Sequence, residues 1–383
     1  MLELGHSISP GARILVAMSG GVDSALTAAL LQRAGYSCVG VNMRTHHPSD
    51  HEKASGRKFQ SCCSPEDAAD ARAVAQREDF PFYVLDLERE FHDAVIAPFI
   101  NDYLHGRTPN PCVLCNNQLK LGVLLDKATM WDCDFVATGH YARPRTNPAT
   151  GRAELHRAAD ASKDQTYYLS GLRQDQLRKL ICPLGGLEKT AVRTLARELG
   201  LAVHDKPDSQ EICFVPGNDY RAFLRARVGE AALRPGDIVT RDGKTLGRHE
   251  GIAFYTIGQR KGLGISNPEP LYVIDIMADE NLVVVGPDRE TLSAGLTASR
   301  MNWVAMALPS EPFAAAAQIR HHSAPSPGIA SPQADGTLRF IFDTPERAVT
   351  PGQAVVLYDG ESVLAGGWID HPVAVVETAT QEA

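Results

Sequence analysis

Apolar and polar positions in the first half of the chain alternate between two kinds of segment. Short apolar runs rich in β-branched residues predict buried strands at 13–18, 36–43, 81–87 and 135–140. Apolar residues recur at helical spacing after residue 24 and across 90–104 and 116–128. Another helix is predicted to begin at Ser64, because Ser64-Pro65-Glu66-Asp67 supplies an N-cap, a proline at the first helical position and acids near the helix dipole. This alternation predicts a doubly wound parallel sheet whose ligands gather at the carboxyl ends of its strands.

The pattern changes along the second half. A hairpin is predicted over 141–158 with its turn at NPATG, followed by a helix over 188–199. Beyond about residue 217, short glycine-punctuated segments predict a small β-rich module, and from about residue 289 short β runs predict a second, barrel-like one. We therefore expect an α/β domain over 1–217, a small β-rich domain over 218–288 and a β-barrel-like domain over 289–383.

Composition narrows the class of protein. The chain has 383 residues, 44% apolar and 22% charged, as in soluble globular proteins. No apolar run approaches membrane-spanning length and the amino terminus lacks a signal-peptide pattern, so we expect a cytoplasmic protein without a membrane partner. Its eight cysteines are then expected to be reduced. The net charge of −8 argues against wholesale coating by nucleic acid but permits a local basic surface.

The segment SGGVDS, residues 19–24, lies between the first predicted strand and helix. Its two glycines let backbone N–H groups approach a ligand closely, and the helix N-terminus favours negative charge. It matches neither the Walker A loop nor the Rossmann fingerprint. An ordinary tight turn would explain a glycine pair alone, but the complete segment between these flanks predicts a phosphate-binding loop for a nucleotide.

Two cysteine-bearing segments, RTPNPCVLCNNQLK at 107–120 and DKPDSQEICFVPGNDY at 205–220, carry candidate chemistry. Cys112 and Cys115 are spaced C-x-x-C on a proline-constrained loop entering a helix, whose dipole would lower a thiol pKa. The pair could also be half of a zinc site, and Cys213 could be a buried strand residue. A further set could bind a metal, although a flap near the nucleotide is the favoured interpretation: His46, His47, His51, Cys62 and Cys63.

Taken together with other motifs, these segments make the chain resemble the bacterial tRNA-specific 2-thiouridylases, a family of the PP-loop ATP pyrophosphatase superfamily. The resemblance rests on motifs in the expected order: AMSGGVDS, SCCSPEDAADAR, GRTPNPCVLCN, ATGHYAR, SKDQTYYL, DSQEICFVP, GQRKGLGI and AVTPGQAVVLYDG. It implies ATP-dependent replacement of oxygen by sulfur at C2 of the wobble uridine, position 34 of tRNA. The implied ATP site, with Mg²⁺, comprises Ala17, Met18, Ser19, Gly20, Gly21, Val22, Asp23, Ser24, Met43 and Gly139.

The resemblance also implies contacts with tRNA. Asn110, Pro111 and Cys112 would surround the flipped-out target base. The other implied tRNA contacts are His140, Lys163, Asp164, Gln165, Arg320, His321 and Gln353.

By the same resemblance, Cys213 would carry a persulfide loaded by a sulfur-donor protein, and Cys115 would release the sulfur and form a disulfide with Cys213. Cys112 occupies a place where many family members have an aspartate, so an alternative is a [4Fe-4S] cluster held by Cys112, Cys115 and Cys213. Rival functions are a PP-loop ligase for a small metabolite and a tRNA-binding sulfur-relay protein without chemistry of its own. We expect a monomer.

Overall fold

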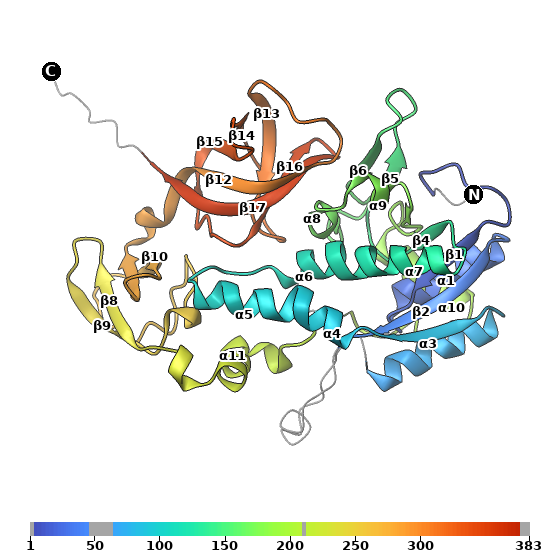
Figure 1. Ribbon diagram of the computed structural model, residues 1–383, viewed down its shortest axis with the longest axis horizontal. Coiled ribbons are helices and arrows are strands. Elements are labelled where there is room, and N and C mark those ends of the chain that lie inside the picture. Colours follow the sequence, from blue (N-terminus) through green and yellow to red (C-terminus); the bar gives the residue numbers. More distant parts are fainter. Residues whose placement is uncertain (1–3, 46–63, 209–211, 376–383) are drawn as a thin grey trace. The chain divides into compact units, whose positions relative to one another are not determined.

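The computed structural model describes residues 4–45, 64–208 and 212–375. The chain divides into two compact units, and each is described by itself. The first comprises Met1–Ile96, Pro111–Tyr220 and Gly360–Val363, and the second comprises Ala97–Asn110, Arg221–Asp359 and Leu364–Ala383. Figure 1 labels many of the helices and strands of both units.

The first unit is built on a five-stranded sheet with the order β3-β2-β1-β4-β7, in which neighbouring strands are parallel. The strands are β1 (Arg13–Ala17), β2 (Ser37–Arg44), β3 (Phe82–Asp86), β4 (Phe135–Ala137) and β7 (Leu180–Ile181). This arrangement confirms the predicted parallel sheet. The chain runs outward from β1 to β3 and then crosses to β4 on the other side of β1, so the loops after β1 and β4 flank a topological switch point, where ligands bind in such folds.

Three helices pack against this sheet and one another: α1 (Val22–Arg33), α3 (Pro65–Arg77) and α10 (Lys189–Glu198). The core between them includes the buried side chains of Ile14, Leu26, Val74 and Val192. The predicted start of α3 is confirmed: the Ser64 hydroxyl accepts from the backbone of Asp67, whose side chain reaches back in a capping box.

The middle helices differ from their predicted bounds. The expected helix over 90–104 consists of α4 (Glu88–Phe91), the π-helical η1 (His92–Ile96) and α5 (Ala97–Leu104). The expected start at residue 116 was wrong, because α6 (Pro111–Leu114) leads into the π-helical η2 (Cys115–Val123) and α7 (Leu124–Met130). Proline suits a first helical position, since its fixed φ is helical and it lacks an N–H that would have no intrahelical acceptor there. Cys112 and Cys115 therefore lie in helical backbone and not in a loop.

The rest of the first unit surrounds the sheet. The predicted hairpin is confirmed as β5 (Arg143–Thr146) and β6 (Ala153–His156), and β6 also pairs with the start of β17 at Ser362. The remaining short elements are α8 (Thr166–Leu169), α9 (Gln174–Leu177) and the 3₁₀ turn η3 (Pro216–Asn218).

The second unit contains a small sheet and a β-barrel. The sheet has the order β10-β11-β8-β9, from β8 (Gly236–Thr240), β9 (Thr245–His249), β10 (Tyr272–Met277) and β11 (Leu282–Gly286). The barrel closes where β12 pairs with β17, and its strands are β12 (Leu292–Trp303), β13 (Phe313–Gln318), β14 (Ser326–Pro332), β15 (Leu338–Arg347), β16 (Ala354–Asp359) and β17 (Ser362–Ala374). Before the barrel strands come α11 (Tyr220–Val228), whose first residue still belongs to the first unit, and the 3₁₀ turns η4 (Glu230–Ala232), η5 (Ile252–Phe254) and η6 (Asp288–Thr291).

The predicted fold class, an α/β domain with a parallel sheet followed by β-rich parts, is thus confirmed. Among the helices of the described residues, none combines the length and the apolar character needed to cross a bilayer.

Candidate functional site

The loop Ser19–Ser24 runs from the end of β1 into the first turn of α1 and is closed by its own hydrogen bonds. The Ser24 hydroxyl accepts from the backbone N–H of Ser19 at 3.1 Å and donates to the carbonyl of Gly21 at 3.1 Å. Gly20 has a φ of 77°, and a Cβ there would lie 2.3 Å from the Asp67 carbonyl oxygen. Only glycine therefore fits this turn, which lies against the first turn of α3.

The ends of β2 and β4 adjoin this loop. The buried Asn42, in β2 beside Met43, donates from its side chain to the carbonyl of Met18 at 2.8 Å. Gly139 follows β4, and a Cβ there would lie 2.8 Å from backbone atoms of Asp23 and Ser24. The fold thus brings together residues that are more than a hundred positions apart in the sequence, at the switch point of the sheet. Asn42 was missed, although a polar residue in an otherwise apolar strand is a signal.

Asp23 is held by two side chains that the sequence reasoning missed. The Lys189 ammonium donates to both carboxylate oxygens at 2.8 Å, and the Tyr141 hydroxyl donates to one of them at 2.8 Å. Burial, together with the negative charge of Asp23, raises the pKa of Tyr141 and keeps its proton in place. Lys189 is only 8% exposed, and a lysine so buried requires a carboxylate partner. The signal in the sequence was a lysine among the buried positions of an amphipathic helix.

Asp208 forms a second centre of charge beside Asp23. Its carboxylate pairs with Lys163 at 2.8 Å, with Lys189 at 2.8 Å and with Arg193 at 3.1 Å. Burial raises the pKa of Asp208, but hydrogen bonds and charge from Lys163 and Lys189 outweigh this effect, so the net pKa is lowered. Lys189 therefore bridges the carboxylates of Asp23 and Asp208.

Lys206, two residues before Asp208, connects its chain segment to the loop Ser19–Ser24 and to α3. Its ammonium donates to the carbonyl of Gly20 at 3.0 Å and pairs with Asp67 and Asp70 of α3, each at 2.6 Å. Burial lowers the pKa of Lys206, but the hydrogen bonds to the two aspartates outweigh it and the net pKa is raised. Lys206 therefore stays charged at neutral pH.

The three candidate cysteines are partly exposed thiols in the first unit. Cys112 lies in α6 and Cys115 is the first residue of η2. Cys213 precedes Phe214, whose ring packs edge-on against Phe91 of α4 with centroids 5.5 Å apart, and α4 in turn contacts η2. The segment of Cys213 is therefore anchored on a helix that packs against the helix of Cys115.

Other thiols differ in their surroundings. Burial raises the pKa of both Cys38 and Cys182 to about 12, so these thiols stay protonated. Across residues 4–45, 64–208 and 212–375, no group of three His, Cys, Asp or Glu side chains is arranged to hold a metal ion. The alternative metal set, His46, His47, His51, Cys62 and Cys63, lies outside the described residues.

Residues of the first unit that the resemblance assigned to tRNA have partners within the protein. Lys163 pairs with Asp208, as described above. The buried carboxylate of Asp164 accepts from Arg157 at 3.0 Å and from the Thr166 hydroxyl at 2.8 Å. Gln165 accepts from the backbone N–H of Tyr141 at 2.9 Å through its side chain. Asp164 and Gln165 therefore hold β6 and Tyr141 in place from the turn before α8.

His140 follows Gly139 at the end of β4. Its Nδ1 lies 2.8 Å from the Thr138 hydroxyl. Burial, with a smaller effect of the Lys120 charge, lowers the pKa of His140 to about 3. Its ring is therefore neutral at physiological pH, and it can offer a hydrogen bond but not a positive charge.

The second unit brings two of the other assigned residues together. The Gln353 side chain donates to the carbonyls of Thr108 and Pro109, each at 3.0 Å, and accepts from the Asn110 side chain at 3.5 Å. In the barrel, Arg320 lies 3.5 Å from a carboxylate oxygen of Glu346. His321 stacks on His322 with ring centroids 4.3 Å apart, and burial together with the His322 charge lowers the pKa of His321 to about 4.

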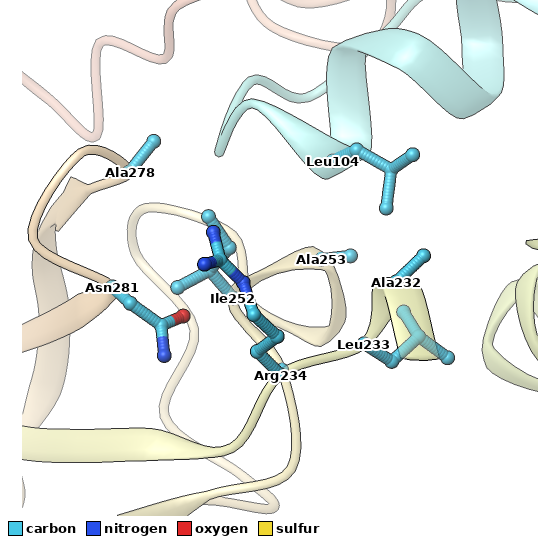
Figure 2. Close-up of a pocket in the computed structure, with 9 residues that line it drawn as sticks. Leu104, Ala232, Leu233, Arg234, Ile252, Ala253, Ala278 and Asn281 are labelled. Atoms are coloured by element: carbon cyan, nitrogen blue, oxygen red, sulfur yellow. The ribbon is translucent and has the colours of Figure 1, made fainter. Parts of the chain in front are cut away.

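A small cavity of about 40 Å³ in the second unit is lined by residues of α5, η4 and η5, among them Leu104, Leu233 and Ile252, with Arg234 and Asn281 as polar neighbours (Figure 2). This volume is of the order of one water molecule's share of the liquid. The cavity is too small for a nucleotide and contains no residue of the candidate site.

The contact between Gly139 and the loop yields a first prediction. Gly139→Ala should weaken ATP binding by about 1–3 kcal/mol, roughly five- to 150-fold in Kd, because the new methyl group would displace the backbone of Asp23 and Ser24. The matched control is Gly247→Ala in β9, where a Cβ meets only Ile265 at 3.5 Å. Titration calorimetry measures both, and equal ATP affinities in the two variants would contradict the assignment.

The lowered pKa of His140 yields a second prediction. An unfolded chain binds a proton at His140 below about pH 6.5, whereas the folded chain does so only near pH 3. The contribution of neutral His140 to the free energy of unfolding is therefore fully present above pH 6.5 and is lost as the pH falls toward 3. His140→Asn should flatten the decline of Tm between pH 6.5 and 4.5, and parallel Tm curves for the two proteins would refute the burial argument.

Comparisons with known proteins agree across the whole chain. Three family models match in succession: a tRNA methyl transferase HUP domain at residues 12–217, a tRNA methyl transferase PRC-barrel domain at 221–287 and an aminomethyltransferase β-barrel domain at 293–369. Curated relatives of the chain carry the name tRNA-specific 2-thiouridylase. The chain is 47% identical to the tRNA-specific 2-thiouridylase of Geotalea uraniireducens, in an alignment that covers 97% of this chain and 98% of the relative. It is 48% identical to the enzyme of the same name from Geobacter metallireducens, with 94% of this chain and 96% of the relative covered. At this identity and coverage, the chain belongs to the family of tRNA-specific 2-thiouridylases.

Proposed function

We propose that this chain is a tRNA sulfurtransferase that uses ATP to replace the C2 oxygen of the uridine at position 34 of tRNA with sulfur. The proposal is supported by the family and above all by one observation: Lys189 and Lys206 join the nucleotide loop to the chain segment that leads to Cys213. A ligase for a small metabolite would have no use for a reactive thiol tied to its phosphate loop. A sulfur-relay protein would have no use for the loop.

The reaction needs ATP because a uracil carbonyl oxygen is a poor leaving group. In the proposed first step the C2 oxygen attacks the α-phosphorus of ATP and pyrophosphate leaves, so that AMP becomes the leaving group at C2. The proposed ATP site consists of the residues named from the sequence, Ala17 to Ser24 with Met43 and Gly139. We expect Mg²⁺ to enter with ATP, because Asp23 is the carboxylate of the loop and is already shared with Lys189 and Tyr141.

Sulfur delivery is proposed to use the two partly exposed thiols. A donor protein loads a persulfide on Cys213, and the Cys115 thiolate attacks the inner sulfur of this persulfide. A Cys115–Cys213 disulfide forms and hydrosulfide leaves with the electron pair of the broken S–S bond. Hydrosulfide adds to C2 and AMP departs. An external dithiol then reduces the disulfide with two electrons.

The tRNA contacts proposed from the sequence fall in both units. Asn110, Pro111 and Cys112 would receive the extruded base, which must leave the stack for reaction. The proposed contacts in the first unit are His140, Lys163, Asp164 and Gln165, and those in the second are Arg320, His321 and Gln353. Because residue 112 is a cysteine, the carboxylate that many family members have there is not present for proton transfer.

An iron–sulfur cluster at Cys112, Cys115 and Cys213 is the rival route for sulfur. Each of the three thiolates would bind a different iron of such a cluster. We propose the persulfide route and derive no step through a cluster. Iron content and anaerobic absorbance of the purified protein test this choice directly.

The proposed function predicts that AMP and pyrophosphate are formed only when substrate tRNA is present, with 2-thiouridine appearing in the same tRNA. Labelled ATP with chromatography of the products, and mass spectrometry of the nucleosides, measures both. AMP formation from ATP and a small amine or acid without tRNA would identify a ligase instead. Failure to form AMP under any condition would leave only the relay protein.

The sulfur pathway predicts that Cys213→Ser and Cys115→Ser each lower thiolation by roughly a hundredfold or more, because each removes a reacting atom. ATP binding should survive in both. Cys133→Ser is the control, since the Cys133 thiol donates to the Trp131 carbonyl and a serine hydroxyl can replace that contact. Normal thiolation by either variant would show that its residue does not carry the assigned role.

A further inference from the structure

The segment from His204 to Asp208, which we call the tie segment, is fastened to its surroundings at three points, all in the first unit. Arg193 of α10 donates to the carbonyls of His204 at 2.9 Å and Lys206 at 3.1 Å. Lys206 reaches the Gly20 carbonyl of the nucleotide loop. These bonds hold the backbone of the tie segment between α10 and the loop.

Asp208, at the end of the tie segment, completes the connection. Through Lys189 its carboxylate is linked to Asp23 of the nucleotide loop, and through Lys163 it is linked to a residue of the SKDQ motif. Lys163, Lys189 and Arg193 thus pair with Asp23 or Asp208, and the carboxylate of Asp160 accepts from the backbone N–H of Lys189 at 3.0 Å. Lysine ammonium groups bind phosphates well, so ATP would enter a site whose lysines already hold the tie segment.

Cys213 lies five residues after Asp208, so the two Cα atoms can be at most about 17 Å apart. The position of Asp208 therefore restricts where the thiol can go. From the other side, Phe214 is anchored on Phe91.

We propose that Asp208 is a positioning residue that holds the Cys213 segment on the ATP loop, so that sulfur reaches the activated uridine before water does. The inference rests on the proposed function, because it assumes an adenylated uridine and a sulfur-bearing Cys213. Without the carboxylate, activation of tRNA continues while delivery of sulfur becomes slow, and the activated uridine is hydrolysed back to uridine and AMP.

Asp208→Asn tests the proposal because it keeps the shape of the side chain and removes its charge. The wild type should form close to one AMP per 2-thiouridine, and in Asp208→Asn this ratio should rise about fivefold or more. Asp205→Asn is the matched control in the same segment, since Asp205 is exposed and pairs with Arg197 and His204 instead of the lysines of the site. Its ratio should equal that of the wild type.

A second readout does not depend on activity. Alkylation of Cys213 by iodoacetamide, followed by mass spectrometry without ATP or tRNA, should be about threefold faster in Asp208→Asn than in the wild type or Asp205→Asn, because the segment is released. The buried Cys182 serves as the internal reference for global unfolding. If Asp208→Asn does not fold, Arg193→Gln removes the clamp from the other side and should give the same two changes.

An AMP ratio near one together with wild-type alkylation in a folded Asp208→Asn protein would overturn the proposal. A parallel rise in the Asp205→Asn control would also overturn it. The two hypotheses fail differently. If the wild type forms no AMP with tRNA, the proposed function is wrong, and if the wild type does so while Asp208→Asn behaves normally, only the positioning role is wrong.

Discussion

The site depends on one buried ammonium group shared between two carboxylates. Lys189 lies 2.8 Å from oxygens of both Asp23 and Asp208, and it is almost removed from solvent. A lysine so buried would lose its charge or destabilise the fold without such partners, and two carboxylates so close would repel each other without a cation. The nucleotide loop and the segment before Cys213 are therefore stable together and costly to separate, since breaking a buried pair leaves an uncompensated charge.

Several residues that the resemblance assigns to tRNA also hold the fold of their own unit. Gln165 fixes the backbone of Tyr141, whose hydroxyl supports Asp23, and Asp164 holds the turn before α8. In the second unit the Gln353 side chain donates to the carbonyls of Thr108 and Pro109, the two residues before Asn110. A side chain whose polar atoms are partly committed to the protein has a fixed orientation, which reduces the entropy lost when it binds RNA.

The thiols illustrate how local backbone changes chemistry. Because the helix begins at Pro111, Cys112 lies in its first turn and is partly exposed, whereas Cys38 and Cys182 are buried and their thiols stay protonated. The π-helical geometry of η2 begins at Cys115 itself. π-helical segments are frequent at functional sites, where they change the direction of side chains relative to a regular helix.

The sequence by itself determined the strands, most helices and the turn at Ser19–Ser24, because hydrophobic period, proline and glycine act over a few residues. It also supplied the family and its motifs, while the domain boundaries and individual site roles stay predictions. Only the tertiary structure decided that Lys189, Lys206 and Asp208 surround the loop, since these residues are more than 160 positions from it and no local pattern encodes a charge pair between distant segments. The start of the helix at Pro111 was also missed, because the apolar pattern there is too short to mark a boundary. Packing of α10 against α1 decides which charges meet.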